Sequence, residues 1–490
     1  MFPRKYHFFE MKPPCHKPKK SEIQNPTFKI VRFSLQAPRV CVIVQSYFQT
    51  RESHTHTMDK LIVEGGTRLS GSVNISGSKN ASLPILAAAL LTDEPVRITR
   101  VPDVSDTNYM LQILSQLGCS VERSSGTVRI ESPEGISHKA SYEQVRKMRA
   151  SICLLGPLMA RMKKCVLPLP GGCVIGDRPV DLHIRGIKAL GARVQVKGGN
   201  LVIDAPNGLI GTTIDMRGDS GPTVLGTDNV MMAAVLAKGT TIIESAAREP
   251  EVVDLANFLN KMGARIEGAG SRTITVHGVE KLHGCDHTVI PDRIEAGTFM
   301  VAAAMVSDGL MINRVCRAHM KAISDLLIEC GHRVEYNEDG TSVFVAPGEN
   351  PRSGKILTNP YPEYPTDMQA QMTALFALTP GISVVKDTIF PQRFMHCSEL
   401  KRMGANIKVD SGTAIITGVS GLSGAPVMAS DLRASAALVL AALAAEGTTE
   451  IHRLYHIDRG YEMLDEKLMT LGAKVKRVRD LEQSAFGEEN

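Results

Sequence analysis

One cysteine-containing segment is the part of this sequence best suited to covalent or acid–base chemistry. Residues 167–179 read Leu-Pro-Leu-Pro-Gly-Gly-Cys-Val-Ile-Gly-Asp-Arg-Pro, and their proline and glycine content predicts a loop. Cys173 follows two glycines, and Lys163, Lys164 and Arg178 lie near it in the sequence. Nearby cations favour the thiolate form of a cysteine. The pattern predicts a reactive thiol, with a cysteine of no chemical role as the alternative.

Asp367 is a second candidate, in the segment Tyr-Pro-Thr-Asp-Met-Gln at 364–369. The simplest interpretation is a carboxylate at the N-terminus of a helix, where it caps or stabilises the first turn. The other interpretation is a general base within hydrogen-bond reach of a substrate hydroxyl. The sequence alone does not separate the two.

Two arginines, Arg393 and Arg459, follow segments that are expected to be strands. Arginine binds carboxylate and phosphate groups through two parallel hydrogen bonds. Either arginine alone is more often part of a surface ion pair. Together with Lys79, Arg178 and Arg433 they predict a site for a substrate that carries several anionic groups. The sequence has no P-loop, no dinucleotide-binding glycine motif and no metal-ligand cluster, so we expect no metal and no cofactor.

A short phrase that recurs six times indicates how these residues are positioned. Its glycines are spaced by 73, 72, 68, 73 and 68 residues, which predicts six units of about 70 residues. In each copy the phrase is typical of an amphipathic helix that ends at a left-handed glycine before a strand. The six glycines are Gly118, Gly191, Gly263, Gly331, Gly404 and Gly472.

A second class of helix recurs with the same period and is apolar on nearly all sides, which predicts burial. These helices are expected to begin near Lys79, Met148, Ser220, Arg293, Thr366 and Asp431. The N-terminus of a buried helix has free N–H groups and attracts anions. Ser220 and Asp431 are also explained as N-caps, whereas Lys79, Arg149 and Arg433 are not. Six units predict an α/β protein of two domains with three units each.

Charge is distributed unevenly along the 490 residues. Residues 1–57 hold ten Lys or Arg and three Asp or Glu, a balance of +7, whereas the remaining residues have a balance of −2. A near-neutral body and an aromatic content of 4% argue against nucleic-acid binding. The longest apolar stretch, 434–445, is shorter than the roughly 18 residues that a membrane helix needs.

We interpret 1–57 as a disordered leader or a mis-assigned start before Met58, with a basic arm for an anionic partner as the alternative. We interpret 481–490 as a polar tail.

The chain from about Met58 to Arg479 resembles the UDP-N-acetylglucosamine 1-carboxyvinyltransferases, enolpyruvyl transferases of the EPSP synthase-like superfamily. The matching motifs occur in the family's order at 77–81, 148–151, 170–173, 178–183, 365–369, 393–396, 431–435 and 458–462. The resemblance implies a two-domain inside-out α/β barrel of six βαβαββ-type units. It also implies a first domain of 79–291 and a second of 58–78 plus 292–480.

The resemblance implies a reaction as well. The enolpyruvyl group of phosphoenolpyruvate would pass to the 3′-hydroxyl of UDP-N-acetylglucosamine with release of phosphate, in the cytoplasm, as the committed step of peptidoglycan biosynthesis. Cys173 would be the proton donor, would form a covalent adduct and would be alkylated by the epoxide fosfomycin. Asp367 would be the base, and Lys79 and Arg459 would also be catalytic residues. Phosphoenolpyruvate would be bound by Lys79, Asn80, Arg178, Arg393, Arg433 and Arg459, and the UDP-sugar by Asn80, Arg149, Arg178, Pro179, Val180, Asp181, Leu182, Asp367 and Ile389.

Two alternatives stay open at this point. The sister enzyme, 5-enolpyruvylshikimate-3-phosphate synthase, shares the fold and the chemistry but lacks the Gly-Gly-Cys loop. A non-catalytic anion-binding protein on the same scaffold would not need Cys173 or Asp367. The segment 220–227 departs from the family's Ser-Val-Gly-Ala-Thr phrase and looks about three residues longer, which puts the local nucleotide contacts in doubt. The sequence does not give the oligomeric state.

Overall fold

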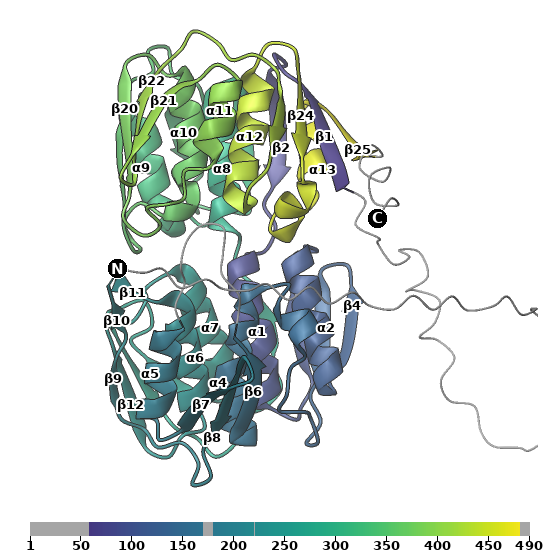
Figure 1. Cartoon of the computed structure of the whole chain (residues 1–490), viewed down its shortest axis with the longest axis vertical. Helices are drawn as coiled ribbons and strands as arrows, with labels where there is room; N and C mark the ends of the chain where they lie inside the picture. Colours follow the sequence, from purple (N-terminus) through teal and green to yellow (C-terminus); the bar gives the residue numbers. More distant parts are fainter. Residues whose placement is uncertain (1–57, 170–179, 220, 481–490) are drawn as a thin grey trace, which may run out of the picture. The chain divides into compact units, whose positions relative to one another are not determined.

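The computed structural model describes residues 58–169, 180–219 and 221–480. These described residues belong to one compact unit, whose helices and strands are labelled in Figure 1. The expectations for the leader 1–57 and the tail 481–490 fall outside the described residues.

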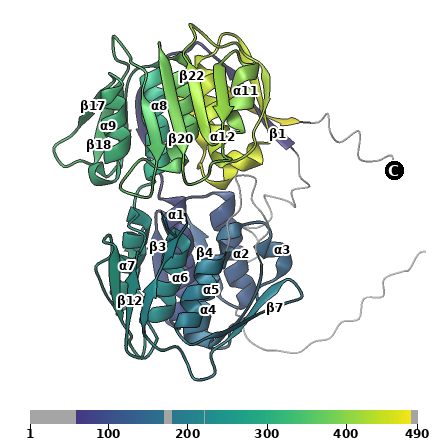
Figure 2. The same ribbon diagram turned by 60° about the vertical axis from the view of Figure 1, so that its left-hand side comes forward.

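One unit of the chain illustrates the repeating structure. It runs through β19 (Lys355–Thr358), η4 (Thr366–Met368), α10 (Gln369–Leu378), β20 (Ile382–Asp387), α11 (His396–Arg402), β21 (Asn406–Asp410) and β22 (Thr413–Thr417). The sheet has the order β19-β20-β22-β21, with β19 parallel to β20 and the other neighbours antiparallel. The sheet packs against α10, and Figure 2 shows its strands β20 and β22. This is the βαβαββ pattern that the sequence predicted.

Four other sheets repeat this arrangement of one parallel edge and two antiparallel pairs. The first two are β15 (Asp286–Thr288), β3 (Val96–Thr99), β5 (Thr127–Glu131), β4 (Ser120–Ser124); and β9 (Thr213–Asp215), β12 (Thr240–Glu244), β14 (Thr273–His277), β13 (Arg265–Glu267). The next two are β2 (Leu69–Asn74), β16 (Ser307–Asn313), β18 (Ser342–Ala346), β17 (Arg333–Tyr336); and β23 (Pro426–Met428), β24 (Thr448–His452), β1 (Met58–Glu64), β25 (Lys474–Asp480).

The remaining large sheet has three strands, β6 (Lys164–Pro168), β8 (Asn200–Asp204) and β7 (Arg193–Lys197). A parallel bridge between Lys139 and Val166 takes the place of its fourth strand.

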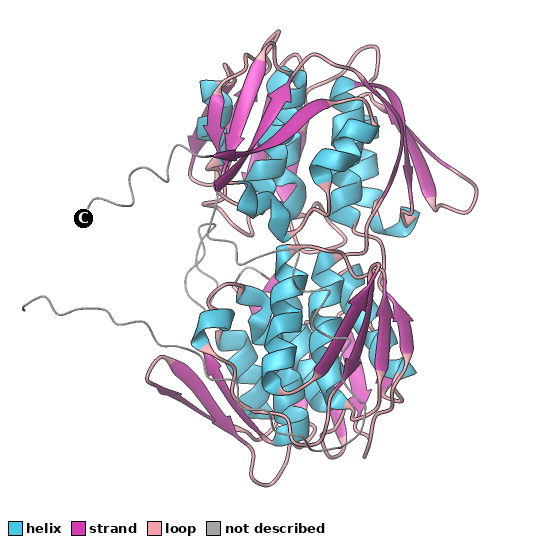
Figure 3. Ribbon diagram, turned by 90° about the vertical axis from the view of Figure 1, so that its right-hand side faces the viewer, coloured by secondary structure: helices cyan, strands magenta, loops and turns pink. Residues whose placement is uncertain are grey.

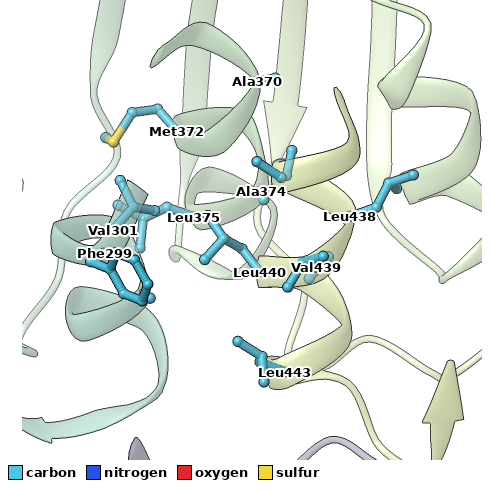
Figure 4. Close-up of a cluster of buried hydrophobic side chains, with 14 of the residues drawn as sticks. Phe299, Val301, Ala370, Met372, Ala374, Leu375, Leu438, Val439, Leu440 and Leu443 are labelled. Carbon is cyan, nitrogen blue, oxygen red and sulfur yellow. The ribbon is translucent and has the colours of Figure 1, made fainter. Parts of the chain in front are cut away.

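The predicted buried helices lie in the interior, flanked by the strands (Figure 3). They are α1 (Lys79–Ala88), η2 (Arg149–Leu154) with α4 (Leu155–Met162), α6 (Val224–Ala234), α8 (Arg293–Val306), α10 and α12 (Leu432–Ala444). Apolar side chains of α8, α10 and α12 meet in one core, where Phe299, Leu375 and Leu440 are almost fully buried (Figure 4). Burial on all sides explains why these helices have no polar face.

The amphipathic helices end as the repeated phrase predicts. They are α2 (Ser105–Leu117), α5 (Asp181–Ala189), α7 (Pro250–Lys261), α9 (Lys321–Glu329), α11 and α13 (Leu464–Thr470). The six glycines of the phrase have φ between 89° and 108°. Only glycine adopts this conformation without strain, so the prediction is confirmed at every copy.

The expected helix start near Ser220 is wrong. α6 begins at Val224, and the Thr223 hydroxyl caps it by accepting a hydrogen bond from the Gly226 amide at 3.2 Å. Before it, the strand β10 (Arg217–Gly218) pairs with β11 (Gly221–Pro222) in a tight hairpin. Gly221 has a φ of +99°, which is incompatible with a helical turn. Ser220 itself lies outside the described residues.

The described residues form two hydrophobic cores. One core contains residues between 81 and 289, and the other contains residues between 61 and 75 and between 294 and 475. The backbone passes from one to the other where Gly77 forms a bridge with Pro291. The exact division into domains at 79–291 and 58–78 plus 292–480 stays a prediction. In the described part of the chain, no helix has the length and hydropathy required to cross a membrane.

Candidate functional site

Three of the predicted site residues form what we call the Asp367 cluster, namely Asp367, Arg393 and Arg433. Asp367 lies in η4, Arg393 follows β20 and Arg433 is in the first turn of α12. The Arg393 Nη1 donates to Asp367 Oδ1 at 2.8 Å, and the Arg433 Nη2 donates to Asp367 Oδ2 at 3.1 Å. Each carboxylate oxygen of Asp367 is therefore held by a different guanidinium group.

The electrostatics of this cluster favour full ionisation. Burial opposes the charged form of Asp367, but the charges and hydrogen bonds of Arg433 and Arg393 hold the pKa of its carboxyl well below the usual range. Burial also opposes the charge of Arg433, yet Asp367 raises the pKa of that guanidinium. Asp431, predicted as an N-cap, accepts hydrogen bonds from the amides of Arg433 and Ala434 at 2.9 and 3.2 Å. The N-cap interpretation is thus confirmed for Asp431, whereas Asp367 pairs with arginines.

A buried carboxylate that the sequence analysis missed, Asp387, supports the same cluster. It ends β20 and accepts from the Ile389 amide at 2.9 Å and from the Thr366 hydroxyl at 2.7 Å. The Arg393 Nη1 in turn donates to Thr366 Oγ1 at 3.3 Å. Asp387 thereby connects the half-buried Ile389 segment to the backbone that carries Asp367.

Two further predicted residues, Lys79 and Arg459, converge on Asp106, and we call these three the Asp106 cluster. The Lys79 Nζ lies 3.3 Å from Asp106 Oδ2, and the Arg459 Nε lies 3.0 Å from Asp106 Oδ1. Lys79 begins α1, Asp106 lies in the first turn of α2, and Arg459 ends η5 (Leu454–Arg459). This cluster joins residues that are 353 positions apart in the sequence.

The charges of the Asp367 cluster also affect the pKa of Lys79. Burial lowers the pKa of its ammonium below the usual value; Asp106 raises it, and the charges of Arg433 and Arg459 lower it further. Asp367 is a further charged neighbour of Lys79, so one small region contains three positive side chains (Lys79, Arg433 and Arg459) and two negative ones (Asp106 and Asp367). A net positive charge at buried helix N-termini is suited to binding an anion with several charges.

Several residues predicted for the UDP-sugar lie along a connected path. Ser78 caps α1, which leaves the neighbouring Asn80 half-buried in its first turn. Val180 precedes α5, Asp181 is exposed at its first position, and Leu182 packs on the β10–β11 hairpin, where a Cβ on Gly218 would lie 2.9 Å from its Cδ1. A Cβ on Gly221 would lie 2.9 Å from Pro360 Cγ, next to the Ile389 segment.

Arg149 begins η2 and is half-buried. It lies near the buried His183, whose pKa is lowered to about 4 by burial and then by the charge of Arg149. The His183 ring lies 2.9 Å from the Asn229 amide nitrogen, which also donates to the Ile152 carbonyl at 3.0 Å. His183 thereby connects α5 to α6, and Asn229 connects α6 to the η2 segment that carries Arg149.

Cys173, Arg178 and Pro179 fall outside the described residues, so their predicted roles are not tested by the geometry. The seven cysteines that are described are all free thiols. Burial raises the pKa of Cys165 to about 12, as expected for a cysteine that fills a core. Within the described ranges, no group of His, Cys, Asp or Glu side chains is arranged to hold a metal ion.

The sequence analysis missed Asp106, Asp387 and Glu462. Asp106 is a first-turn carboxylate in Val-Ser-Asp-Thr, which reads as ordinary helix stabilisation. Asp387 ends a strand, and Glu462 closes the motif Asp-Arg-Gly-Tyr-Glu at 458–462. Only the last carried a signal, since it belongs to a motif whose arginine was already singled out.

Comparison with known proteins gives a consistent result. The sequence profile of the family described as EPSP synthase (3-phosphoshikimate 1-carboxyvinyltransferase) matches residues 63–468. A UDP-N-acetylglucosamine 1-carboxyvinyltransferase from Akkermansia muciniphila is 75% identical over 423 residues, covering 86% of this chain and 99% of that protein. A protein of the same name from Methylacidiphilum infernorum is 55% identical over 422 residues, covering 86% of this chain and 99% of that protein.

Two solved structures share the fold. The enolpyruvyl transferase NikO from Streptomyces tendae superposes with a TM-score of 0.78 at 27% identity, covering 86% of this chain and all of that one. An EPSP synthase from Acinetobacter baumannii superposes with a TM-score of 0.68 at 17% identity, covering 86% of this chain and 100% of that one, which speaks for the fold alone.

Proposed function

We propose that this chain transfers the enolpyruvyl group of phosphoenolpyruvate to UDP-N-acetylglucosamine and releases phosphate. The chain belongs to the EPSP synthase (3-phosphoshikimate 1-carboxyvinyltransferase) family and, within it, to the UDP-N-acetylglucosamine 1-carboxyvinyltransferases. The observation that carries the proposal is a pair of neighbouring clusters, in each of which one aspartate forms ion pairs with two cationic side chains. Phosphoenolpyruvate has one carboxylate and one phosphate, so it offers one anion to each pair. The product leads to peptidoglycan, and we place the reaction in the cytoplasm on the strength of the family resemblance.

The Asp367 cluster receives the substrate carboxylate. In the free protein, Asp367 occupies the hydrogen-bonding positions of Arg393 and Arg433 that a carboxylate would take. The incoming carboxylate displaces Asp367 from both guanidinium groups. Because those groups hold the pKa of Asp367 low, displacement raises its proton affinity. Asp367 then becomes a competent base for the 3′-hydroxyl of the sugar at the moment when the other substrate is in place.

The Asp106 cluster receives the substrate phosphate. Lys79 and Arg459 donate to its oxygens, and Arg178 is a third donor on the family resemblance. Asn80 lies in the first turn of α1 and contacts both substrates, and the positive end of the helix dipole at this place favours anions. Fixed cations at this place also stabilise the phosphate as it leaves.

The chemistry follows from these placements. The sugar oxygen forms a bond to C2 of phosphoenolpyruvate while Asp367 takes the hydroxyl proton and Cys173 donates a proton to C3. In the second step the bond between C2 and the phosphate oxygen breaks and phosphate leaves with the bonding electrons, while the Cys173 thiolate takes a proton back from C3, which restores the double bond. Cys173 also forms a covalent adduct at C2. Positive charge that develops at C2 is stabilised by the bound carboxylate and by the site's preorganised dipoles.

The UDP-sugar occupies the path from α5 to the Ile389 segment. Arg149, Arg178, Pro179, Val180, Asp181 and Leu182 bind the nucleotide side, and Asn80, Asp367 and Ile389 bind the sugar. We further propose that 79–291 and 58–78 plus 292–480 are the two domains, and that they close around both substrates to exclude water.

Phosphate release from phosphoenolpyruvate tests the proposal. The assay offers UDP-N-acetylglucosamine or shikimate-3-phosphate as acceptor, each with and without fosfomycin pretreatment. We expect release only with the UDP-sugar, abolished by fosfomycin in the wild type and insensitive to fosfomycin in Cys173→Asp. No release with either acceptor, from a folded preparation that begins at Met58, would leave a scaffold that only binds anions.

A further inference from the structure

The segment that carries Arg459 is attached to the start of α2 at two points. At the first, Arg459 donates to Asp106 at 3.0 Å. At the second, the backbone amide of Asp103 donates to Glu462 Oε1 at 2.6 Å. Asp103 and Asp106 are three positions apart in one segment, and Arg459 and Glu462 are three positions apart in the other. The carboxylate that accepts is Asp106 at the first point and Glu462 at the second. The two contacts together fix the relative position and orientation of the two segments.

Glu462 has a second partner, in the backbone segment that leads to Lys79. Its Oε2 accepts a hydrogen bond from the Ser76 hydroxyl. Ser76 is itself held firmly, because its amide donates to Glu295 Oε2 at 2.9 Å and its hydroxyl accepts from the Lys467 Nζ at 2.7 Å. A single carboxylate thus connects its own segment, which carries Arg459, to the two segments that carry Lys79 and Asp106.

The ion pair between Arg459 and Asp106 is partly exposed to solvent, and the contacts of Glu462 add to it. The Arg459 side chain is 36% exposed, and solvent weakens ion pairs of exposed arginines. Asp103 is held by other contacts, since its Oδ1 accepts from the Asn108 amide group at 2.8 Å, and the Asn108 Oδ1 accepts from Arg123 at 2.7 Å. Glu462 therefore binds to the backbone just before α2, and contacts that do not involve Arg459 hold this backbone in place.

We propose that Glu462 is a positioning residue for the transfer reaction, which holds Arg459 against the start of α2 so that Arg459 and Lys79 bind the substrate phosphate as a pair on Asp106. The inference rests on the proposed function of these two cations. Glu462 does not touch substrate in this account and acts through Arg459. Its removal therefore affects the phosphate of phosphoenolpyruvate and the phosphate product alike, and leaves the UDP-sugar unaffected.

Steady-state kinetics of Glu462→Ala, Glu462→Asp and Glu462→Gln test the inference, with Glu466→Ala as the matched control. Glu466 is an exposed glutamate on α13, four residues away. For Glu462→Ala we expect the KM for phosphoenolpyruvate and the inhibition constant of inorganic phosphate to rise together by about tenfold, the size expected for a charge-assisted hydrogen bond. The KM for UDP-N-acetylglucosamine should stay within about twofold of wild type by the same argument.

The conservative variants separate positioning from a purely structural role. Glu462→Gln keeps an acceptor for the Asp103 amide, so it should recover most of the lost affinity for phosphoenolpyruvate. Glu462→Asp folds without reaching Asp103 and should behave like Glu462→Ala. A fall in kcat and melting temperature with both KM values unchanged, or equal losses in Glu462→Gln and Glu462→Ala, would overturn the inference. An inactive wild type would instead contradict the proposed function, so the two failures are distinguishable.

Discussion

The Asp367 cluster and the Asp106 cluster each consist of one aspartate paired with two cationic side chains. The two clusters differ in which parts of the fold supply these residues. All members of the Asp367 cluster come from elements around one hydrophobic core, and the side chains of Arg393 and Arg433 are only 5% and 3% exposed. In the Asp106 cluster, Lys79 and Asp106 come from α1 and α2 of the other core, whereas the more exposed Arg459 comes from η5.

One cluster therefore lies within a single hydrophobic core and the other is assembled from two cores. This difference predicts how the two anionic groups of the substrate are bound. In a site within one core the two guanidinium groups are already in place, so binding of the carboxylate requires only that Asp367 move aside. A site assembled from two cores depends on additional contacts for its geometry, which is the part we assign to Glu462. We therefore expect mutations in the Asp367 cluster to affect both stability and activity, and mutations in the Asp106 cluster to affect mainly phosphate binding.

The largest expected effect is that of Arg433→Ala. Loss of this buried guanidinium leaves half of the Asp367 carboxylate unpaired, which should lower the free energy of unfolding by about 3 kcal/mol. The kcat/KM for phosphoenolpyruvate should fall roughly a thousandfold, because a charged partner of the carboxylate is lost. Urea denaturation and steady-state kinetics measure the two effects.

Arg459→Ala is the matched comparison for Arg433→Ala. Its effect on the free energy of unfolding should be about 1 kcal/mol or less, since the side chain is partly exposed, while its kcat/KM for phosphoenolpyruvate should also fall strongly. Equal destabilisation by the two variants would break the distinction between a preformed and an assembled cluster.

A smaller effect concerns the pH dependence of phosphoenolpyruvate binding. Lys79 must be protonated to bind phosphate, and burial with two neighbouring arginines lowers its pKa. Affinity should therefore fall as pH rises, at a pH below the ordinary pKa of lysine. In Asp106→Asn the carboxylate that raises this pKa is removed, so the loss of affinity should move to a lower pH.

Calorimetric binding of phosphoenolpyruvate between pH 7 and 10 measures this shift. A Cys173→Ala background removes the titration of the thiol from the measurement. Asp367→Asn on the same background serves as the comparison, because Asp367 contributes least among the neighbours of Lys79. A shift toward higher pH in Asp106→Asn would contradict the assigned role of Asp106.

The smallest expected effect is thermal protection by inorganic phosphate. Millimolar phosphate should raise the melting temperature of the wild type by about one or two degrees, because a weak ligand stabilises the folded state only slightly. We expect this increase to persist in Arg433→Ala and to disappear in Lys79→Ala. Protection that is lost in Arg433→Ala instead would mean that the two clusters do not discriminate between phosphate and carboxylate.

Local sequence patterns predicted much of the fold. The six glycines and the apolar helices are determined by neighbouring residues, and both were predicted from their periodicity. The start of α6 was misplaced because Gly221 and Pro222 form a hairpin with Arg217 and Gly218, a pairing that no periodicity reveals.

The site was predictable only in part, for the same physical reason. Lys79, Arg433 and Asp367 were singled out by their place at buried helix starts. Asp106 and Glu462 each contact partners more than 350 positions away, so their importance depends on tertiary contacts. A first-turn carboxylate such as Asp106 has a sufficient local explanation, and its second role is visible only once Lys79 and Arg459 lie beside it.

The most direct test of the account is a crystal structure of Cys173→Ala with phosphoenolpyruvate and UDP-N-acetylglucosamine bound. We predict the substrate carboxylate within about 3 Å of the guanidinium groups of Arg393 and Arg433, the phosphate on Lys79 and Arg459, and Asp367 turned toward the sugar 3′-hydroxyl. Asp367 still paired with both arginines while phosphoenolpyruvate is bound would contradict the displacement on which the account depends.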